Sequence, residues 1–97
     1  MQGILLRMIK LEAEVTGRVQ GVFYRAYVQD AALALGVVGT VQNKPDGSVQ
    51  VIAEGAPDDL KSLVEYLHEG SLQSQVGGVA VEWGSASGTF DEFTIVT

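Results

Sequence analysis

The sequence has no cysteine, only two prolines and a single histidine. The lack of cysteine excludes disulfides, thiolate metal sites and a cysteine nucleophile. No apolar run approaches the length of a membrane span, and the first six residues lack the charged start of a signal peptide. We therefore expect a cytoplasmic protein without a membrane partner, which agrees with the absence of cysteine.

Basic residues are also scarce. Six lysines and arginines face twelve acidic residues, and the formal net charge is −6. Residues 16–47 hold three basic and two acidic side chains, whereas the rest of the chain holds three basic and ten acidic ones. An acidic surface repels nucleic acid and anionic lipid, so we expect neither as a partner. The only region that acid does not dominate is 16–47, where an anionic ligand would have to be bound by local donors.

The length of 97 residues predicts a single domain, 1–97, with one hydrophobic core. Residues 1–7 show no clear periodicity, and we expect them to form a loose N-terminal extension. Nothing in the sequence requires more than a monomer.

The spacing of apolar residues predicts seven elements. In chain order these are a strand over 9–16, a helix over 24–35, strands over 37–43 and 48–54, a helix over 57–69, and strands over 79–83 and 93–95. Gly36 and Gly70 are helix stops, and Asp46-Gly47 is the signal of a tight hairpin. The order predicts an α+β fold, a ferredoxin-like split βαβ sandwich. It is βαββαβ with an added terminal strand, an antiparallel sheet covered by two helices on one face.

Residues 17–25 join the first strand to the first helix and carry the strongest functional signal. Gly17 and Gly21 allow backbone conformations closed to other residues. Successive N–H groups in such a turn, followed by a helix N-terminus, form an anion-binding concavity. Arg25 adds a guanidinium that can grip two phosphate or carboxylate oxygens. By pattern alone, an ordinary turn followed by a helix-opening arginine explains these residues equally well.

A second stretch makes the pattern specific. Together with residues 39–49, this loop resembles the acylphosphatase family. The family signature is a Val-Gln-Gly-Val loop leading to Phe/Tyr-Arg, here 17–25, and a Gly-x-Val-x-Asn strand running into an Asp-Gly hairpin, here 39–47. The similarity covers residues 9–97 in element order and is concentrated in 17–55. Thr40 departs from the family pattern, since many relatives have tryptophan there.

The resemblance implies the same ferredoxin-like fold and the hydrolysis of small acyl phosphates to a carboxylate and inorganic phosphate. It implies that Arg25 and Asn43 are catalytic, with Asn43 orienting the attacking water. It implies no metal and no organic cofactor. The implied phosphate-binding residues are Arg25 and, through their backbone amides, Arg18, Val19, Gln20, Gly21 and Val22.

The residues missing from this region narrow the substrate class independently. Residues 17–25 contain no histidine, cysteine or lysine base, no acid pair and no metal-ligand cluster, and the hairpin explains Asp46. A site with anion donors but no general acid suits an activated substrate. The carboxylate of an acyl phosphate leaves without being protonated, because the pKa of its conjugate acid is about 4.

Three alternatives stay open. The domain could bind acyl or carbamoyl phosphate without turnover, as in the acylphosphatase-like parts of larger carbamoyl-transfer proteins. It could be a ferredoxin-like regulatory or RNA-binding domain, although its strands lack the aromatic signature of RNA binding. It could also keep an intact site and act through protein contacts. The sequence does not indicate which acyl phosphate is the substrate in the cell.

Overall fold

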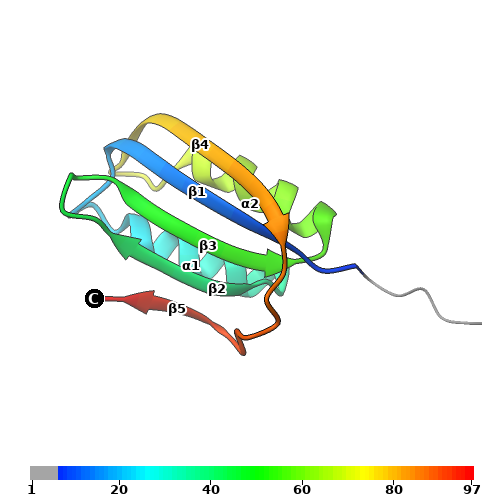
Figure 1. Cartoon of the computed structure of the whole chain (residues 1–97). Helices are drawn as coiled ribbons and strands as arrows, with labels where there is room; N and C mark the ends of the chain where they lie inside the picture. The colour runs from blue at the N-terminus through cyan, green and yellow to red at the C-terminus, as the bar shows by residue number, and fades with distance from the viewer. Residues whose placement is uncertain (1–6) are drawn as a thin grey trace, which may run out of the picture.

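The computed structural model describes residues 7–97, and the predicted extension at 1–7 therefore lies outside it except for Arg7, which is exposed. The elements in chain order are β1 (Ile9–Arg18), α1 (Tyr24–Leu35), β2 (Val38–Asn43), β3 (Val49–Gly55), α2 (Pro57–Glu69), β4 (Gln75–Ser85) and β5 (Phe93–Val96) (Figure 1). All seven predicted elements are present. In the part of the chain that is described, neither helix is long and apolar enough to cross a membrane.

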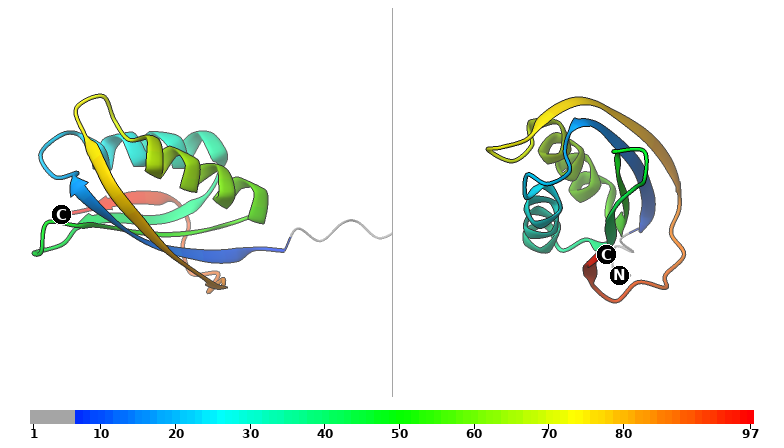
Figure 2. Two further views of the ribbon diagram at one scale, coloured as in Figure 1. Left: turned by 90° about the horizontal axis from the view of Figure 1, so that it is seen from above. Right: turned by 90° about the vertical axis from the view of Figure 1, so that its left-hand side faces the viewer.

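The five strands form one sheet in the order β4-β1-β3-β2-β5. The pairs β1–β3, β1–β4 and β2–β3 are antiparallel, whereas β5 runs parallel to β2. Both helices lie on the same face of the sheet, as the two side views show (Figure 2). The α+β, ferredoxin-like prediction is confirmed. Its antiparallel sheet holds for the first four strands, and the added strand makes the complete sheet mixed.

Two strands are longer than their sequence patterns indicate. β1 continues through Gly17 and Arg18, which the sequence pattern places in the loop, and β4 already begins at Gln75. The cause is pairing between the two, which extends from Ile9 opposite Ser85 to Arg18 opposite Gln75 with a bulge between Thr16 and Gly17. Backbone pairing with a partner strand therefore overrides the weak strand propensity of these glycine-rich segments.

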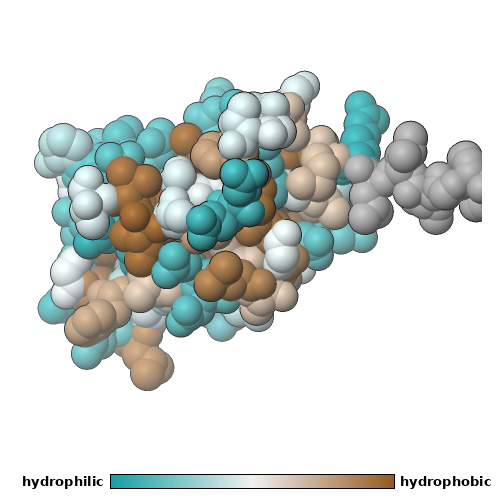
Figure 3. Space-filling model, turned by 90° about the horizontal axis from the view of Figure 1, so that it is seen from below, coloured by the Kyte–Doolittle hydropathy of each residue, from teal (hydrophilic) through white to brown (hydrophobic). Residues whose placement is uncertain are grey.

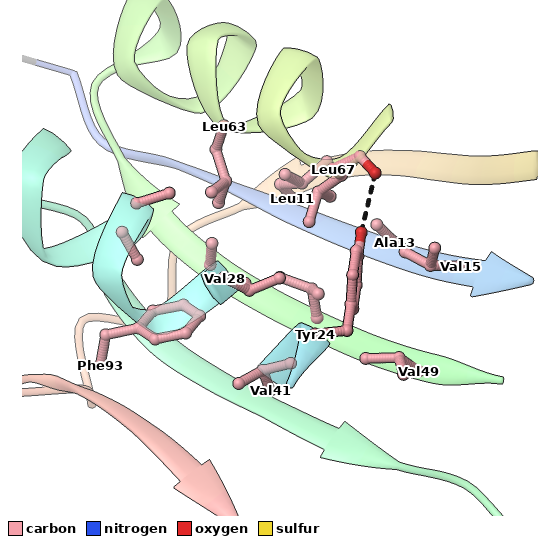
Figure 4. Close-up of a cluster of buried hydrophobic side chains, with 14 of the residues drawn as sticks. Leu11, Ala13, Val15, Tyr24, Val28, Val41, Val49, Leu63, Leu67 and Phe93 are labelled. Atoms are coloured by element: carbon pink, nitrogen blue, oxygen red, sulfur yellow. Dashed lines mark hydrogen bonds between the residues drawn. The ribbon is translucent and has the colours of Figure 1, made fainter. Parts of the chain in front are cut away.

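The core lies between the sheet and the helices (Figure 4). Alternate residues of β1 and β3 face the apolar stripes of α1 and α2, and each fully buried aliphatic side chain stabilises the fold by roughly 1.5–3 kcal/mol. Tyr24, 1% exposed, is buried among them, and its hydroxyl donates a hydrogen bond to the carbonyl of Leu67 at 2.8 Å. This bond ties the start of α1 to the end of α2.

Candidate active site

The loop of residues 19–23 leaves β1 at a point where the backbone is tightly packed. Gly17 has a φ of 114°, and a Cβ there would collide with the backbone of Gln75 and Gly77 on β4. Val19 and Val22 are buried on either side of Gln20 and Gly21. Gly21 has a φ of 73°, which glycine adopts without strain. The loop is therefore anchored at both sides, while Gly21 between them is exposed.

The amides of this loop are open donors. Among residues 7–97, the N–H groups of residues 19–23 donate no hydrogen bond to any acceptor of the chain. Helix α1 follows directly, with no side-chain cap and no acidic residue in its first turn. The loop amides thus add to the positive end of the helix dipole, and no carboxylate of residues 7–97 accepts a hydrogen bond from them.

Arg25 projects from the first turn of α1 and is half-buried. Its Nη1 donates a hydrogen bond to the carbonyl oxygen of Val96 at 3.4 Å, and Gln29 makes a similar bond to the carbonyl of Phe93 at 3.0 Å. Both acceptors belong to β5. In the described chain the ion pairs are Lys10–Glu12 and Lys44–Glu14, so no carboxylate neutralises Arg25 there.

Asn43 is the last residue of β2, and its Oδ1 is buried without a hydrogen-bond partner. A buried polar atom that is left unpaired is rare in folded proteins and calls for an explanation. The hairpin that follows Asn43 is closed by its own hydrogen bonds. Asp46 accepts hydrogen bonds from the N–H and the hydroxyl of Ser48, and these bonds lower the pKa of the Asp46 carboxyl below its ordinary value.

Gln20 joins the loop to the hairpin. Its Nε2 donates to the carbonyl oxygens of Lys44 and Ser48, each at 2.8 Å. The side chain therefore fixes the distance between the loop amides and Asn43. This positioning role could not be seen in the sequence, because the two partners are distant along the chain.

Arg25 and Asn43 line one cavity of about 290 Å³. The other lining residues are Val19, Gly21, Phe23, Tyr24, Ala26 and Ile95. Arg18, Gln20 and Val22 are absent from the lining, although the last two belong to the same loop. The loop, the hairpin and the C-terminal end of β5 meet at one end of the sheet (Figure 1). The surface along the β5 side presents hydrophobic side chains among hydrophilic ones (Figure 3).

The contribution of β5 to this cavity was missed by sequence reasoning, as was that of Phe23. Ile95 enters the lining because β5 pairs with β2, where it lies opposite Val41, two residues before Asn43. The single histidine, His68, is exposed near the end of α2. Within the described residues, no group of three or more His, Cys, Asp or Glu side chains is arranged to hold a metal ion.

Comparison with known proteins identifies the family of this chain. The family model described as acylphosphatase matches residues 11–95. The chain belongs to the acylphosphatase family. Acylphosphatase from Salinibacter ruber is 43% identical over 86 residues, covering 89% of this chain and 90% of the relative. Acylphosphatase from Thermus thermophilus is 46% identical over 81 residues, covering 84% and 92%.

Solved structures agree with these matches. The crystal structure of acylphosphatase from Bacillus subtilis superposes with a TM-score of 0.89 at 36% identity, covering 92% of this chain and 99% of that one. The prediction of an acylphosphatase enzyme is thereby confirmed. The roles of Arg25, Asn43 and the loop amides stay predictions.

Proposed function

We propose that the protein hydrolyses the carboxyl–phosphate bond of small acyl phosphates, releasing a carboxylate and inorganic phosphate. The observation that carries this proposal is the cavity shared by Arg25 and the buried, unpaired Oδ1 of Asn43, with unpaired loop amides beside it. Acylphosphatase relatives at 43% and 46% identity support the reaction class.

The phosphate is bound by the guanidinium of Arg25 and the loop amides. Val19, Gln20, Gly21 and Val22 supply N–H groups that no acceptor in the described chain occupies. Arg18 is the weakest member of the predicted set, because it ends β1 opposite Gln75. Preorganised donors of this kind stabilise charge on a transferring phosphoryl group without reorganising during the reaction.

Asn43 orients the attacking water by accepting one of its hydrogens at Oδ1. The water oxygen forms a bond to phosphorus in line with the scissile bond, and the bridging oxygen departs with the electron pair as a carboxylate. The proton of the water passes to a phosphate oxygen, because an amide cannot take it. The cavity lining contains no carboxylate, histidine or lysine, which suits a leaving group that needs no proton.

The test is hydrolysis of benzoyl phosphate by the wild type and by Asn43→Ala, with binding of inorganic phosphate measured by calorimetry. We expect kcat to fall by roughly 10²-fold in Asn43→Ala, on the scale of one lost catalytic contact, while phosphate still binds. Gln42→Ala is the matched control, since it removes an amide from the neighbouring position of β2, outside the cavity lining.

Three results would contradict parts of this proposal. Unchanged kcat in a folded Asn43→Ala variant would remove the role of the asparagine. Phosphate binding by the wild type without any turnover would indicate a binding module. Loss of turnover in EDTA would show that the loop and Arg25 do not suffice without a metal ion.

A further inference from the structure

Phe23 lines the cavity that contains Arg25 and Asn43, here called the phosphate cavity, and it also lines a second hollow. Among residues 7–97 it is the only non-glycine residue with a positive φ, 62°, and its side chain is 75% exposed. Phenylalanine is poorly suited to this backbone conformation, and strained positions of this kind gather at functional sites. The ring contributes little to the core, so its packing there does not explain the strain.

The second hollow is a groove of about 540 Å³ between α1 and the turn that follows α2. Val22, Phe23, Ala26, Tyr27 and Leu72 give it an apolar wall, and Leu72 is fully exposed. The groove has defined geometry because the hydroxyl of Ser71 donates a hydrogen bond to the carbonyl of Val22 at 3.1 Å. Asp30 is its single charged lining residue.

Phe23 and Ala26 line both the groove and the phosphate cavity, so the two are adjacent. Asn43 and Ile95, from β2 and β5, line the cavity only, whereas residues 70–73 line the groove only. Phe23 thus forms part of a wall shared by the groove and the cavity that contains Asn43. In-line displacement requires the leaving group to depart on the side opposite the water. Because no residue of β2 or β5 lines the groove, an acyl group that departs away from Asn43 can enter it.

We propose that Phe23 and this groove form an acyl subsite, which rests on the function proposed above. With the phosphate at Arg25, the groove takes an uncharged, apolar acyl group such as a chain of about six carbons or an aromatic ring. Asp30 and the net charge of −6 disfavour acyl groups that carry a second phosphate or carboxylate. The preferred substrates are therefore acyl phosphates of apolar carboxylic acids.

The test compares kcat/KM for hexanoyl phosphate and acetyl phosphate in the wild type, Phe23→Asn and Leu72→Ser. Asparagine tolerates the positive φ, so Phe23→Asn removes the ring without adding strain. We expect the wild type to favour hexanoyl phosphate by about tenfold, and each variant to lose most of that ratio through a higher KM. The ratio is the measured quantity because it cancels any general loss of activity.

Leu33→Ser is the matched control, since Leu33 is an exposed leucine of α1 that does not line the groove. Its ratio should equal that of the wild type. A wild-type ratio near one, or a ratio unchanged in both Phe23→Asn and Leu72→Ser, would overturn the subsite.

A binding measurement separates this inference from the proposed function. Hexylphosphonate should bind the wild type about tenfold more tightly than methylphosphonate does, and both variants should lose that difference. If the wild type hydrolyses no acyl phosphate, the proposed function fails, and the phosphonate comparison still decides whether the groove binds apolar chains. Equal affinities of the two phosphonates for the wild type would overturn the subsite.

Discussion

The two halves of the molecule follow the same β-α-β path but start their helices with opposite chemistry. Helix α1 begins after a five-residue loop, has no acid in its first turn and carries Arg25 as its second residue. Helix α2 follows β3 after a single linking residue, with Pro57 first and then Asp58 and Asp59. Proline needs no partner for a missing N–H, and the two carboxylates complement the helix dipole.

The same contrast recurs in the backbone donors. Gly21 and Gly88 both have a φ of 73°. At the second position the N–H groups of Ser87 and Gly88 donate to the buried carboxylate of Glu54, at 2.8 and 3.0 Å, and the hydroxyl of Ser87 donates at 2.8 Å. The second half thus fills its anion-binding turn with its own carboxylate, whereas the first half leaves its loop unfilled. The stabilising contacts of the second half are thus missing from the described residues at the proposed phosphate site.

The largest effect is expected from removing the positive charge of Arg25 at the start of α1. Arg25→Ala should lower kcat/KM for benzoyl phosphate by roughly 10²–10³-fold, the scale of losing a strong oxyanion donor. Arg25→Lys should recover little, because a point charge does not grip two oxygens as the guanidinium fork does. Steady-state kinetics on folded protein checks both.

Lys61→Ala controls for the loss of a basic residue, because Lys61 is exposed on α2. It should retain wild-type kinetics. If Arg25→Ala kept the wild-type kcat/KM, the loop amides would suffice to bind the phosphate and to stabilise its charge without Arg25.

A second substitution gives α1 an acidic residue in its first turn, as α2 has. Ala26 is the third residue of α1, as Asp59 is of α2, and it lines the phosphate cavity. Ala26→Asp should weaken binding of inorganic phosphate by roughly tenfold or more, since like charges a few Å apart repel by about 2–4 kcal/mol at an effective dielectric constant near 20. The melting temperature should hold or rise, because a carboxylate suits a helix N-terminus.

Ala26→Asn is the matched uncharged variant. It should bind phosphate more tightly than Ala26→Asp, and calorimetry at two salt concentrations would show the difference shrinking as salt screens the charge. Equal losses in the two variants would mean that bulk in the cavity, not charge, weakens binding.

A third substitution affects the turn at Ser87 and Gly88, whose donors bind the carboxylate of Glu54. Burial alone raises the pKa of Glu54, but hydrogen bonds from Ser87 and Gly88 outweigh it, so its pKa lies below the ordinary 4.5. The resulting stabilisation is therefore present above about pH 4.5 and is lost as the pH falls through the lowered pKa. Glu54→Gln should lower the free energy of unfolding by about 1–2 kcal/mol at pH 7, because an amide cannot accept all three bonds.

Urea unfolding between pH 3 and 7 checks this prediction. The difference in the free energy of unfolding between the wild type and Glu54→Gln should shrink toward pH 3. Glu65→Gln, at an exposed position of α2, should change the stability little. A difference that stays constant across this pH range would contradict the assignment.

The sequence predicted most reliably what local chemistry determines. Pro57 with two following acids marks the start of α2, and the Asp-Gly pair marks the hairpin after Asn43. These signals act within a few residues, so they can be interpreted without knowing the tertiary structure. The Gly21 turn before Arg25 belongs to the same class, which is why the loop was found.

What the sequence could not show depends on contacts between distant segments. The carbonyl of Val96 reaches Arg25 only because β5 adds to the sheet in parallel beside β2. The two bonds from Gln20 to the hairpin and the extension of β1 to Arg18 also need partners far along the chain. No periodicity encodes these pairings.

The smallest predicted effect comes from the acids of the second helix. Asp58→Ala should lower the free energy of unfolding by only about 0.5 kcal/mol, because an exposed carboxylate interacts weakly with the helix dipole and salt screens it. Urea unfolding in low and high salt should show the loss fading as salt rises. Hydrolysis of benzoyl phosphate should match the wild type, since Asp58 belongs to the helix start that does not face the cavity. A drop in kcat/KM beyond about twofold would mean that the two helix starts are electrostatically coupled. The start of α2 would then affect catalysis as well as stability, and the contrast between the two helix starts would fail.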